Sequence, residues 1–256
     1  MATWDPSRYL RYADERSRPF VELVTRVEGD PRTIVDLGCG PGHLTAVLRS
    51  RWPDATVLGV DSSPEMIERA RADADDDRVS YELADVATWE PDEPVDLIIS
   101  NALFQWVPDQ LAVIERLGRH VAAHGTFALQ TPNNYAAPSH RLLAEIASRP
   151  AYRELTDGLH DDRGTAAGAY LALFSRLGWS ADAWETTYLH VLQGEDPVLD
   201  WISGTGARPV LEALPDALRA EFVAEYGAAL REAYPAKPWG TVLPFTRVFT
   251  VARRGA

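Results

Sequence analysis

Several features that mark other classes of protein are scarce or missing in this 256-residue sequence. Cys39 is the only cysteine, which excludes an internal disulfide framework and fits a reducing compartment. No apolar stretch approaches the ~20 residues that cross a bilayer. The N-terminus also lacks the basic region and apolar run of a secretory signal. We therefore expect a cytoplasmic protein with no membrane partner.

Positive charge is also in short supply. The sequence has 25 basic and 38 acidic residues, which gives a formal net charge of −13. A surface with this balance repels a phosphate backbone, so that a nucleic-acid partner is not expected. Lys237 is the only lysine, a bias that we attribute to genome composition. The composition favours an enzyme of small molecules and does not specify an oligomeric state.

One stretch, residues 33–42, combines the pattern of a buried strand with closely spaced glycines. Its apolar, β-branched start reaches Asp36, and Gly38, Gly40 and Gly42 follow at intervals of two. Apolar residues at helical spacing come next, so the order predicts a strand, a tight turn and a helix. Glycine lets the backbone turn sharply and lets a ligand approach more closely than a Cβ atom would allow. The stretch therefore predicts a loop that binds a nucleotide-like molecule.

Predicted strands and helices alternate over the first half of the chain. The strands are 33–37, 56–60, 79–83, 95–100 and 126–130, with helices at 44–52, 62–70 and 109–121. Ser62 and Glu65 have the spacing of a capping box, which places the start of the second of these helices at Ser62. Two more strands, 183–192 and 246–252, follow after further helices. This rhythm predicts an α/β fold with a doubly wound, mostly parallel sheet, as a single domain over residues 1–256.

Two helical segments lie outside this alternation. Residues 4–30 contain helices, the second of which begins near Pro19, because proline is tolerated in a first turn. We expect this segment to lie over the cofactor site. Residues 193–242 form a helical insertion before the last strand, which suits a substrate lid.

Polar residues stand at or near the carboxyl end of the predicted strands, where ligands bind in open α/β sheets. They are Asp36, Asp61, Asp85, Asn101 and Gln130. A dinucleotide fingerprint requires G-x-G-x-x-G, whereas the third glycine here gives G-x-G-x-G. The carboxylate of Asp36 opposes a pyrophosphate but complements a sulfonium or ammonium group. Asp61 is placed to accept both ribose hydroxyls, and Asp85 to accept an adenine amino group. S-adenosylmethionine therefore fits this pattern better than NAD.

The segment from Asp36 to Gly42, with Asp61 and Asp85, resembles the cofactor motifs of class I S-adenosylmethionine-dependent methyltransferases. The resemblance implies a Rossmann-like sheet of seven strands, the last of which runs antiparallel. It also implies a set of cofactor-binding residues: Asp36, Gly38, Gly40, Gly42, Asp61, Ser62, Asp85, Val86 and Asn101.

Segments along the whole chain resemble, more narrowly, the trans-aconitate 2-methyltransferases within that family. They are residues 4–6, 15–19, 101–106, 186–188, 204–209 and 251–254. This resemblance implies transfer of a methyl group to one carboxylate of trans-aconitate, which yields a monomethyl ester. A carboxylate is already ionised at neutral pH, so the reaction needs positioning and no general base. We expect neither a catalytic acid–base residue nor a metal.

A substrate with several carboxylates needs local positive charge in an acidic protein, and arginine matches a carboxylate with two parallel hydrogen bonds. Arg16 and Arg208 are the preferred candidates, and Arg247 on the final strand is a third. The other predicted substrate-binding residues are Tyr12, Gln105, Trp106 and His190. For each of these seven residues, a surface ion pair or core packing remains the alternative.

Three other functions stay open at this point. The first is a methyltransferase for a different small acid or for an acid bound to an acyl carrier. The second is an NAD-dependent oxidoreductase, which Asp36 and the glycine spacing disfavour. The third is a binding protein that keeps the cofactor fold without turnover.

Overall fold

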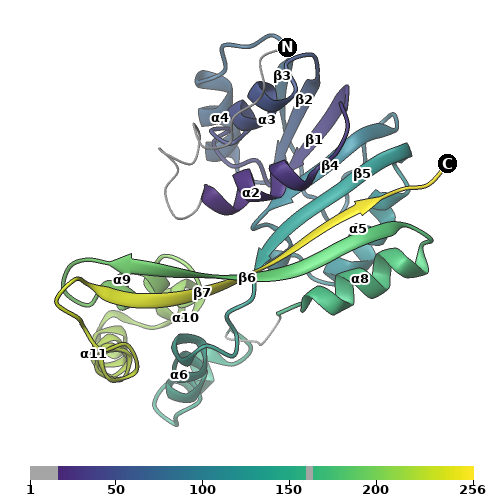
Figure 1. The fold of residues 1–256 in the computed structure, drawn as a ribbon. Coiled ribbons are helices and arrows are strands. Elements are labelled where there is room, and N and C mark those ends of the chain that lie inside the picture. The colour runs from purple at the N-terminus through teal and green to yellow at the C-terminus, as the bar shows by residue number, and fades with distance from the viewer. Residues whose placement is uncertain (1–16, 160–163) are drawn as a thin grey trace. The chain divides into compact units, whose positions relative to one another are not determined.

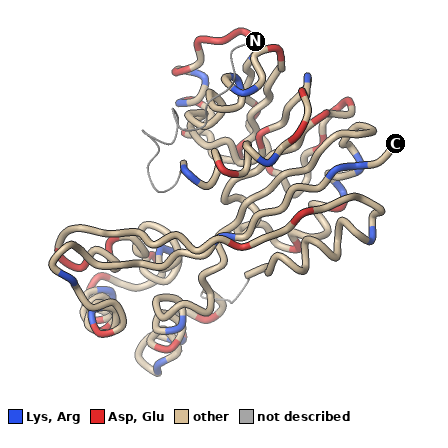
Figure 2. Tube along the Cα trace, in the orientation of Figure 1, with Lys and Arg blue, Asp and Glu red and all other residues tan. Residues whose placement is uncertain are grey.

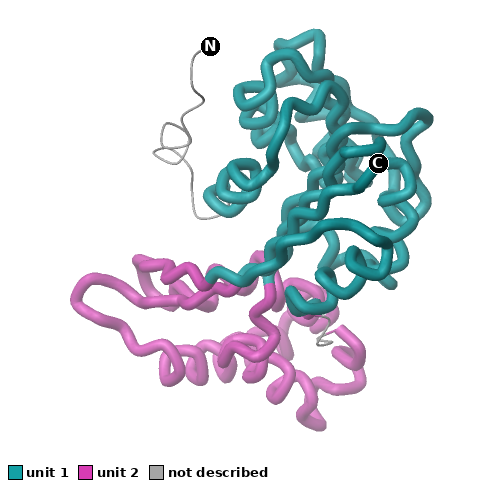
Figure 3. The backbone as a smooth tube through the Cα atoms, turned by 45° about the vertical axis from the view of Figure 1, so that its right-hand side comes forward, with its two compact units in different colours: residues 1–132, 165–186, 247–256 teal, residues 133–164, 187–246 magenta. Residues whose placement is uncertain are grey.

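The computed structural model describes residues 17–159 and 164–256. By its contacts the chain divides into two compact units (Figure 3). Residues 1–132, 165–186 and 247–256 form unit 1, and residues 133–164 and 187–246 form unit 2. Two long strands, β6 (Ser180–Leu192) and β7 (Thr241–Arg253), run through the boundary between these ranges.

Unit 1 is built on a sheet flanked by helices (Figure 1). The remaining strands are β1 (Thr33–Leu37), β2 (Thr56–Asp61), β3 (Val79–Leu83), β4 (Val95–Asn101) and β5 (Val121–Pro132). The helices are α2 (Arg18–Arg26), α3 (Thr45–Arg51), α4 (Pro64–Ala72), η1 (Phe104–Trp106), α5 (Gln110–Gly118) and α8 (Ala167–Arg176). The sheet has seven strands in the order β3-β2-β1-β4-β5-β7-β6. The pairs from β3 to β5 are parallel, and β7 is antiparallel to β5. The predicted fold class is confirmed.

The central strands β1 and β4 are apolar along most of their length because both faces of a parallel sheet are covered. Ile34, Leu97 and Ile98 are 2% exposed or less. Figure 1 shows α2, α3 and α4 on one face of the sheet and α5 and α8 on the other. On the second face, the Phe127 ring packs between the rings of Phe104 and Phe174, with centroids 6.2 and 5.7 Å away. The sheet is thus covered on both faces, as a doubly wound fold requires.

The boundaries of several elements differ from the prediction. The strands β6 and β7 begin three and five residues earlier than predicted, and α5 ends three residues earlier. The helix α4 is capped by Ser63, whose hydroxyl accepts a hydrogen bond from the Met66 amide, so the cap predicted at Ser62 was wrong by one residue. The strand β5 begins at Val121, five residues earlier than predicted, because the ladder with β4 is interrupted by a bulge. Val95 pairs with Val121 and Leu97 with Thr126. A bulge of this size hides the alternation on which a sequence-based strand assignment depends.

Unit 2 is mainly helical and has its own apolar core. Its helices are α6 (Pro138–Ala147), α7 (Arg153–Thr156), α9 (Pro197–Ser203), α10 (Arg208–Ala213) and α11 (Asp216–Ala233). The core includes Phe222, which packs edge-on against Tyr152 with ring centroids 5.1 Å apart. The Tyr226 hydroxyl donates to the Ser139 carbonyl at 2.8 Å and ties α11 to α6. The helical insertion predicted at 193–242 is thus one part of a unit that also includes residues 133–164.

Charged residues of both signs occur along the described chain of each unit (Figure 2). In unit 1 the Arg49 guanidinium lies 2.6 Å from the Asp76 carboxylate, and in unit 2 Arg231 lies 2.6 Å from Asp196. Across the described residues, each helix is too short or too polar to span a membrane.

Candidate functional site

The glycine loop between β1 and α3 has the backbone geometry that its spacing predicts. Gly38, Gly40 and Gly42 have φ angles of +71°, +56° and +79°, a region that side chains with a Cβ atom rarely adopt. The amides of Gly38 and Cys39 both donate to the Val60 carbonyl, at 2.8 and 3.2 Å, which holds the loop against the end of β2. The loop is therefore a fixed turn at the carboxyl end of the sheet.

The three glycines differ in what surrounds them. A Cβ atom on Gly38 would lie 2.9 Å from the Cβ atom of Leu103, and one on Gly42 would meet the Tyr81 side chain. A Cβ atom on Gly40 would have no described atom within 4 Å. The space beside Gly38 and Gly42 is thus filled by side chains of the protein, whereas the space beside Gly40 is open to a ligand.

Asp61 joins this loop to the helix that follows β2. Its Oδ2 atom accepts a hydrogen bond from the Gly40 amide and its Oδ1 atom accepts one from the Ser63 amide, each at 2.9 Å. Both carboxylate oxygens therefore sit at the carboxyl edge, beside the open side of the loop. Each oxygen can accept a second hydrogen bond, so the side chain suits a pair of ribose hydroxyls. Ser62, also predicted to bind the cofactor, is exposed next to it.

Asp85 and Val86 follow β3, as the sequence predicts. The Asp85 carboxylate is exposed and accepts a hydrogen bond from the Ala87 amide at 2.9 Å, which forms a turn. Val86 is 8% exposed and packs in the core of unit 1. Its carbonyl accepts from the Arg116 guanidinium at 2.8 Å. Contact of either residue with a cofactor remains a prediction.

Asp36 lies beneath the loop and is 2% exposed. The Thr45 hydroxyl lies 3.4 Å from its Oδ2 atom. Burial raises the pKa of Asp36 from 3.8 to about 7; the bond from Thr45 opposes this rise, and the Asp61 charge adds to it. Burial also raises the pKa of the Cys39 thiol, and the charges of Asp36 and Asp61 add to that rise. A protonated thiol is a poor nucleophile, so Cys39 is not suited to covalent catalysis.

The raised pKa predicts that Asp36→Asn stabilises the ligand-free protein at alkaline pH. Below pH 3.8 the carboxyl group is protonated in the folded and unfolded states, and its burial carries no charge penalty. Between pH 3.8 and about 7 the unfolded state loses its proton first, so the stability of the wild type falls as the pH rises. Above pH 7 we expect a gain of about 4 kcal/mol for the asparagine variant.

Urea unfolding of the ligand-free protein at pH 5, 6, 7 and 8 measures this gain. Asp92→Asn is the matched control, because Asp92 is exposed. A difference between Asp36→Asn and the wild type that is the same at pH 5 and pH 8 would contradict the prediction.

The carboxyl ends of β4 and β5, with the adjacent part of the antiparallel strand β7, form a second polar region of unit 1. Asn101 pairs with Gln130 across β4 and β5, and the Ala102 amide donates to the Gln130 carbonyl at 2.8 Å. Ala102 has a φ angle of +56°, which is rare for a residue other than glycine and is often found at functional sites. Within residues 17–159 and 164–256, the buried Asn101 Oδ1 and Gln130 Nε2 atoms have no hydrogen-bond partner. Such unpaired polar atoms indicate a site prepared for a polar ligand.

Arg247 reaches the same region from β7. It pairs with Pro132 at the end of β5, and its guanidinium donates to the Gln130 Oε1 atom at 3.2 Å. Only 5% of the residue is exposed. A buried guanidinium beside a buried amide provides a strong anion-binding environment. Arg247 was a candidate for substrate binding from the sequence, but its position beside Gln130 follows only from the pairing of β5 and β7.

Two predicted substrate-binding residues follow β4 directly. The Gln105 Nε2 atom donates to the Ala102 carbonyl at 2.6 Å, and its buried Oε1 atom has no partner among the described residues. The Trp106 side chain is 60% exposed. These positions put an amide and an aromatic surface next to the polar region at the carboxyl edge.

The other predicted substrate-binding residues do not belong to the described part of unit 1. Tyr12 and Arg16 lie outside the described residues, as do residues 4–16 of the predicted 4–30 segment. Arg208 begins α10 in unit 2, where it is exposed and pairs with Glu212 at 2.7 Å. His190 of β6 is 6% exposed in unit 2 and stacks on Trp201, with ring centroids 5.0 Å apart. Substrate contact by these residues remains a prediction.

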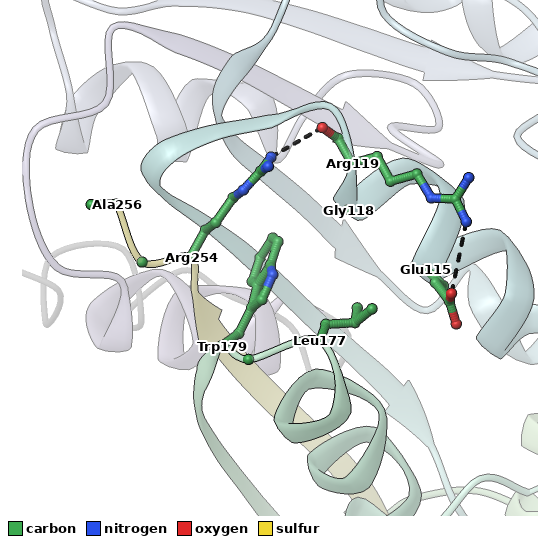
Figure 4. Close-up of a pocket in the computed structure, with 9 residues that line it drawn as sticks. Glu115, Gly118, Arg119, Leu177, Trp179, Arg254 and Ala256 are labelled. Carbon is green, nitrogen blue, oxygen red and sulfur yellow. Dashed lines mark hydrogen bonds and ion pairs between the residues drawn. The ribbon is translucent and has the colours of Figure 1, made fainter.

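A pocket of about 290 Å³ occurs in unit 1, away from all of these residues. It lies between the end of α5, the start of β6 and the last residues of the chain (Figure 4). The Arg254 guanidinium on its wall donates to the Arg119 carbonyl at 3.0 Å. Because α5 ends at Gly118, just before β5 begins, the pocket is at the amino end of that strand. It therefore lies at the opposite edge of the sheet from the glycine loop.

Comparisons with known proteins agree with this geometry. A model of the methyltransferase domain matches residues 34–125, which include the glycine loop, Asp61 and Asp85. A trans-aconitate 2-methyltransferase of Streptomyces avermitilis is 51% identical over 99% of this chain and 98% of its own length. One from Methylobacterium nodulans is 43% identical over 99% of both chains.

Among solved structures, the plantazolicin methyltransferase BpumL, in complex with S-adenosylhomocysteine and a substrate analogue, is similar with a TM-score of 0.52. It is 13% identical and covers 98% of this chain and 89% of that one, so the likeness concerns the fold alone. The identity to the curated relatives extends over nearly the whole of both chains and decides the family. The chain belongs to the trans-aconitate 2-methyltransferases, within the methyltransferases of Rossmann-like fold.

Proposed function

We propose that the protein transfers a methyl group from S-adenosylmethionine to one carboxylate of trans-aconitate and forms a monomethyl ester. The main observation in support of this cofactor is the hydrogen bond from the Gly40 amide to Asp61, beside the open side of the loop. The near full-length identity to the curated relatives supports the substrate.

The residues at the loop fit this cofactor. The open side of Gly40 admits a ligand to the backbone, and the Asp61 oxygens are positioned to accept the ribose hydroxyls. The unpaired Asn101 Oδ1 atom offers an acceptor for an amino group. A pyrophosphate at the loop would lie near the Asp61 carboxylate, and the glycine spacing is not that of a dinucleotide fingerprint, which disfavours NAD. When bound, the cofactor supplies an electrophilic methyl group and leaves as a neutral thioether.

The protein's contribution to this chemistry is positioning and charge. A carboxylate oxygen of the substrate needs no base, because it is ionised at neutral pH and its own lone pair forms the new bond to carbon. Alignment of that oxygen with the methyl group can supply roughly 7–11 kcal/mol of the barrier. We assign the orientation of a substrate carboxylate to Arg247 and the Gln130 amide, with Gln105 and Trp106 beside them.

Arg16, Arg208, Tyr12 and His190 complete the proposed substrate-binding set, as the resemblance implies. We also propose that the helical insertion at 193–242 acts as a lid. A trans-aconitate molecule has three carboxylates, so more than one arginine is needed to offset its charge in a protein of net charge −13.

A substrate panel with a radiolabelled methyl donor tests this function. We expect label in a base-labile ester with trans-aconitate and at least tenfold lower kcat/KM with cis-aconitate, citrate and isocitrate. If another small acid or an acyl-carrier-bound acid were labelled in preference to trans-aconitate, the proposed substrate would be wrong. If calorimetry detected no binding of S-adenosylhomocysteine, the proposed cofactor would be wrong.

A further inference from the structure

Tyr81, in the middle of β3, is a residue to which the sequence analysis assigns no role. It pairs with Gly59 on β2. A Cβ atom on Gly59 would lie 2.6 and 2.8 Å from the Cδ1 and Cε1 atoms of the Tyr81 ring. Gly59 does not have a positive φ angle, so its backbone does not require glycine. The ring of Tyr81 therefore occupies the place of the side chain that Gly59 lacks.

The same ring extends to the third glycine of the loop. A Cβ atom on Gly42 would meet the Tyr81 hydroxyl and would lie 2.8 Å from the Cζ atom. One tyrosine side chain thus lies across Gly59 on β2 and Gly42 in the loop. The backbone of Tyr81 is itself held, because its carbonyl accepts from the Arg71 guanidinium of α4 at 2.8 Å.

The Tyr81 hydroxyl belongs to a hydrogen-bonded group beneath the loop. It lies against Gly42, and Thr45 is the hydrogen-bonding side chain that influences the pKa of this hydroxyl. The Thr45 hydroxyl itself lies 3.4 Å from the Asp36 Oδ2 atom. The Thr45 amide also donates to the Gly42 carbonyl at 3.0 Å. The end of the loop is therefore linked to β1 through Thr45 and to β3 through Tyr81.

We propose that Tyr81 is a positioning residue that holds the glycine loop in the conformation that binds the cofactor. This role rests on the proposed cofactor site and not on the identity of the methyl acceptor. Glycine loses more conformational freedom on ordering than other residues, and this loop has three glycines in five positions. A loop that is ordered in advance binds its ligand more tightly, because less entropy is lost on binding.

The test is Tyr81→Phe, which keeps the ring and removes only the hydroxyl. We expect its Kd for S-adenosylhomocysteine, measured by calorimetry, to rise about tenfold, which is ~1.4 kcal/mol. The KM for S-adenosylmethionine should rise by a similar factor. At saturating cofactor, kcat and the KM for trans-aconitate should stay within twofold of the wild type, because the residue contacts neither reacting group. A change in cofactor affinity without a change in kcat or in the KM for trans-aconitate distinguishes a positioning role from a general loss of structure.

Ser80→Ala is the matched control, since Ser80 is exposed on the same strand. Tyr81→Leu, which also removes the ring, should weaken binding further in the fraction that remains folded. A Tyr81→Phe variant that binds S-adenosylhomocysteine within twofold of the wild type would overturn the role, whatever its melting temperature. A wild type that binds S-adenosylhomocysteine but does not methylate trans-aconitate would overturn the proposed substrate only. A wild type that does not bind S-adenosylhomocysteine would overturn both the cofactor and the role of Tyr81.

Discussion

Replacing Asp61 by alanine is expected to weaken S-adenosylhomocysteine binding about 100-fold, which corresponds to ~2.7 kcal/mol. Two effects combine in this loss. The variant removes the acceptor for the ribose hydroxyls, and hydrogen bonds to a charged group contribute about 1.5–3 kcal/mol each. It also removes the bonds from the Gly40 and Ser63 amides, which hold the loop and the start of α4 at one carboxylate. Calorimetry with S-adenosylhomocysteine at pH 8 measures the change.

Two further variants show whether the loss of affinity is specific to the Asp61 carboxylate. Asp54 precedes the same strand and is exposed, so Asp54→Ala should bind as the wild type does. Asp61→Asn keeps a similar shape but replaces one acceptor with a donor, and its affinity should lie between the other two. An Asp61→Ala variant with a Kd within threefold of the wild type would remove Asp61 from the cofactor site.

Arg247→Gln is expected to raise the KM for trans-aconitate about 100-fold and to leave the Kd for S-adenosylhomocysteine within twofold. The guanidinium is a positive charge buried beside Gln130 at the carboxyl end of β5, which the antiparallel strand β7 reaches at Arg247. Its planar fork matches a carboxylate with two parallel hydrogen bonds, and glutamine offers one donor group without charge. Steady-state kinetics at saturating cofactor measures the effect, and unchanged cofactor affinity shows that the variant is folded.

Arg253→Gln is the matched control on the same strand. The Arg253 side chain is 54% exposed and lies 3.8 Å from Glu28, so we expect no change in KM. Arg208→Ala provides a comparison from unit 2. Its pair with Glu212 is exposed and contributes little to stability, so any rise in KM reports substrate contact. If Arg247→Gln had a normal KM and only a lower melting temperature, Arg247 would be a structural residue.

The proposed cofactor half of the site could be located from the sequence because its signals are local. Three glycines at intervals of two specify a turn with positive φ angles whatever surrounds them, and the structure confirms all three. The parallel strands were visible as apolar runs that end in polar residues. The start of β5 was missed because the bulge after Val121 breaks the alternation. The cap of α4 was placed at Ser62 instead of Ser63 because both serines fit the local pattern.

The proposed substrate half of the site depends on residues that are far apart along the chain. Gln130 and Arg247 are 117 positions apart, and no periodicity relates them; the antiparallel pairing of β5 and β7 brings them within 3.2 Å. The same reason applies to Tyr81, which shares a strand with exposed residues in the sequence but fills the space beside Gly59 and Gly42 in the sheet.

The sequence by itself determined the fold class, the glycine loop and the family, because the alternation of strands and helices and the motif residues can be recognised from short stretches of the chain. Only the tertiary structure decided what lies beside each loop glycine. Gly40 leaves space for a ligand, whereas Gly38 and Gly42 leave space for Leu103 and Tyr81. It also raised the pKa of Asp36, because the pKa of a carboxyl group depends on burial, which neighbours distant in the sequence produce.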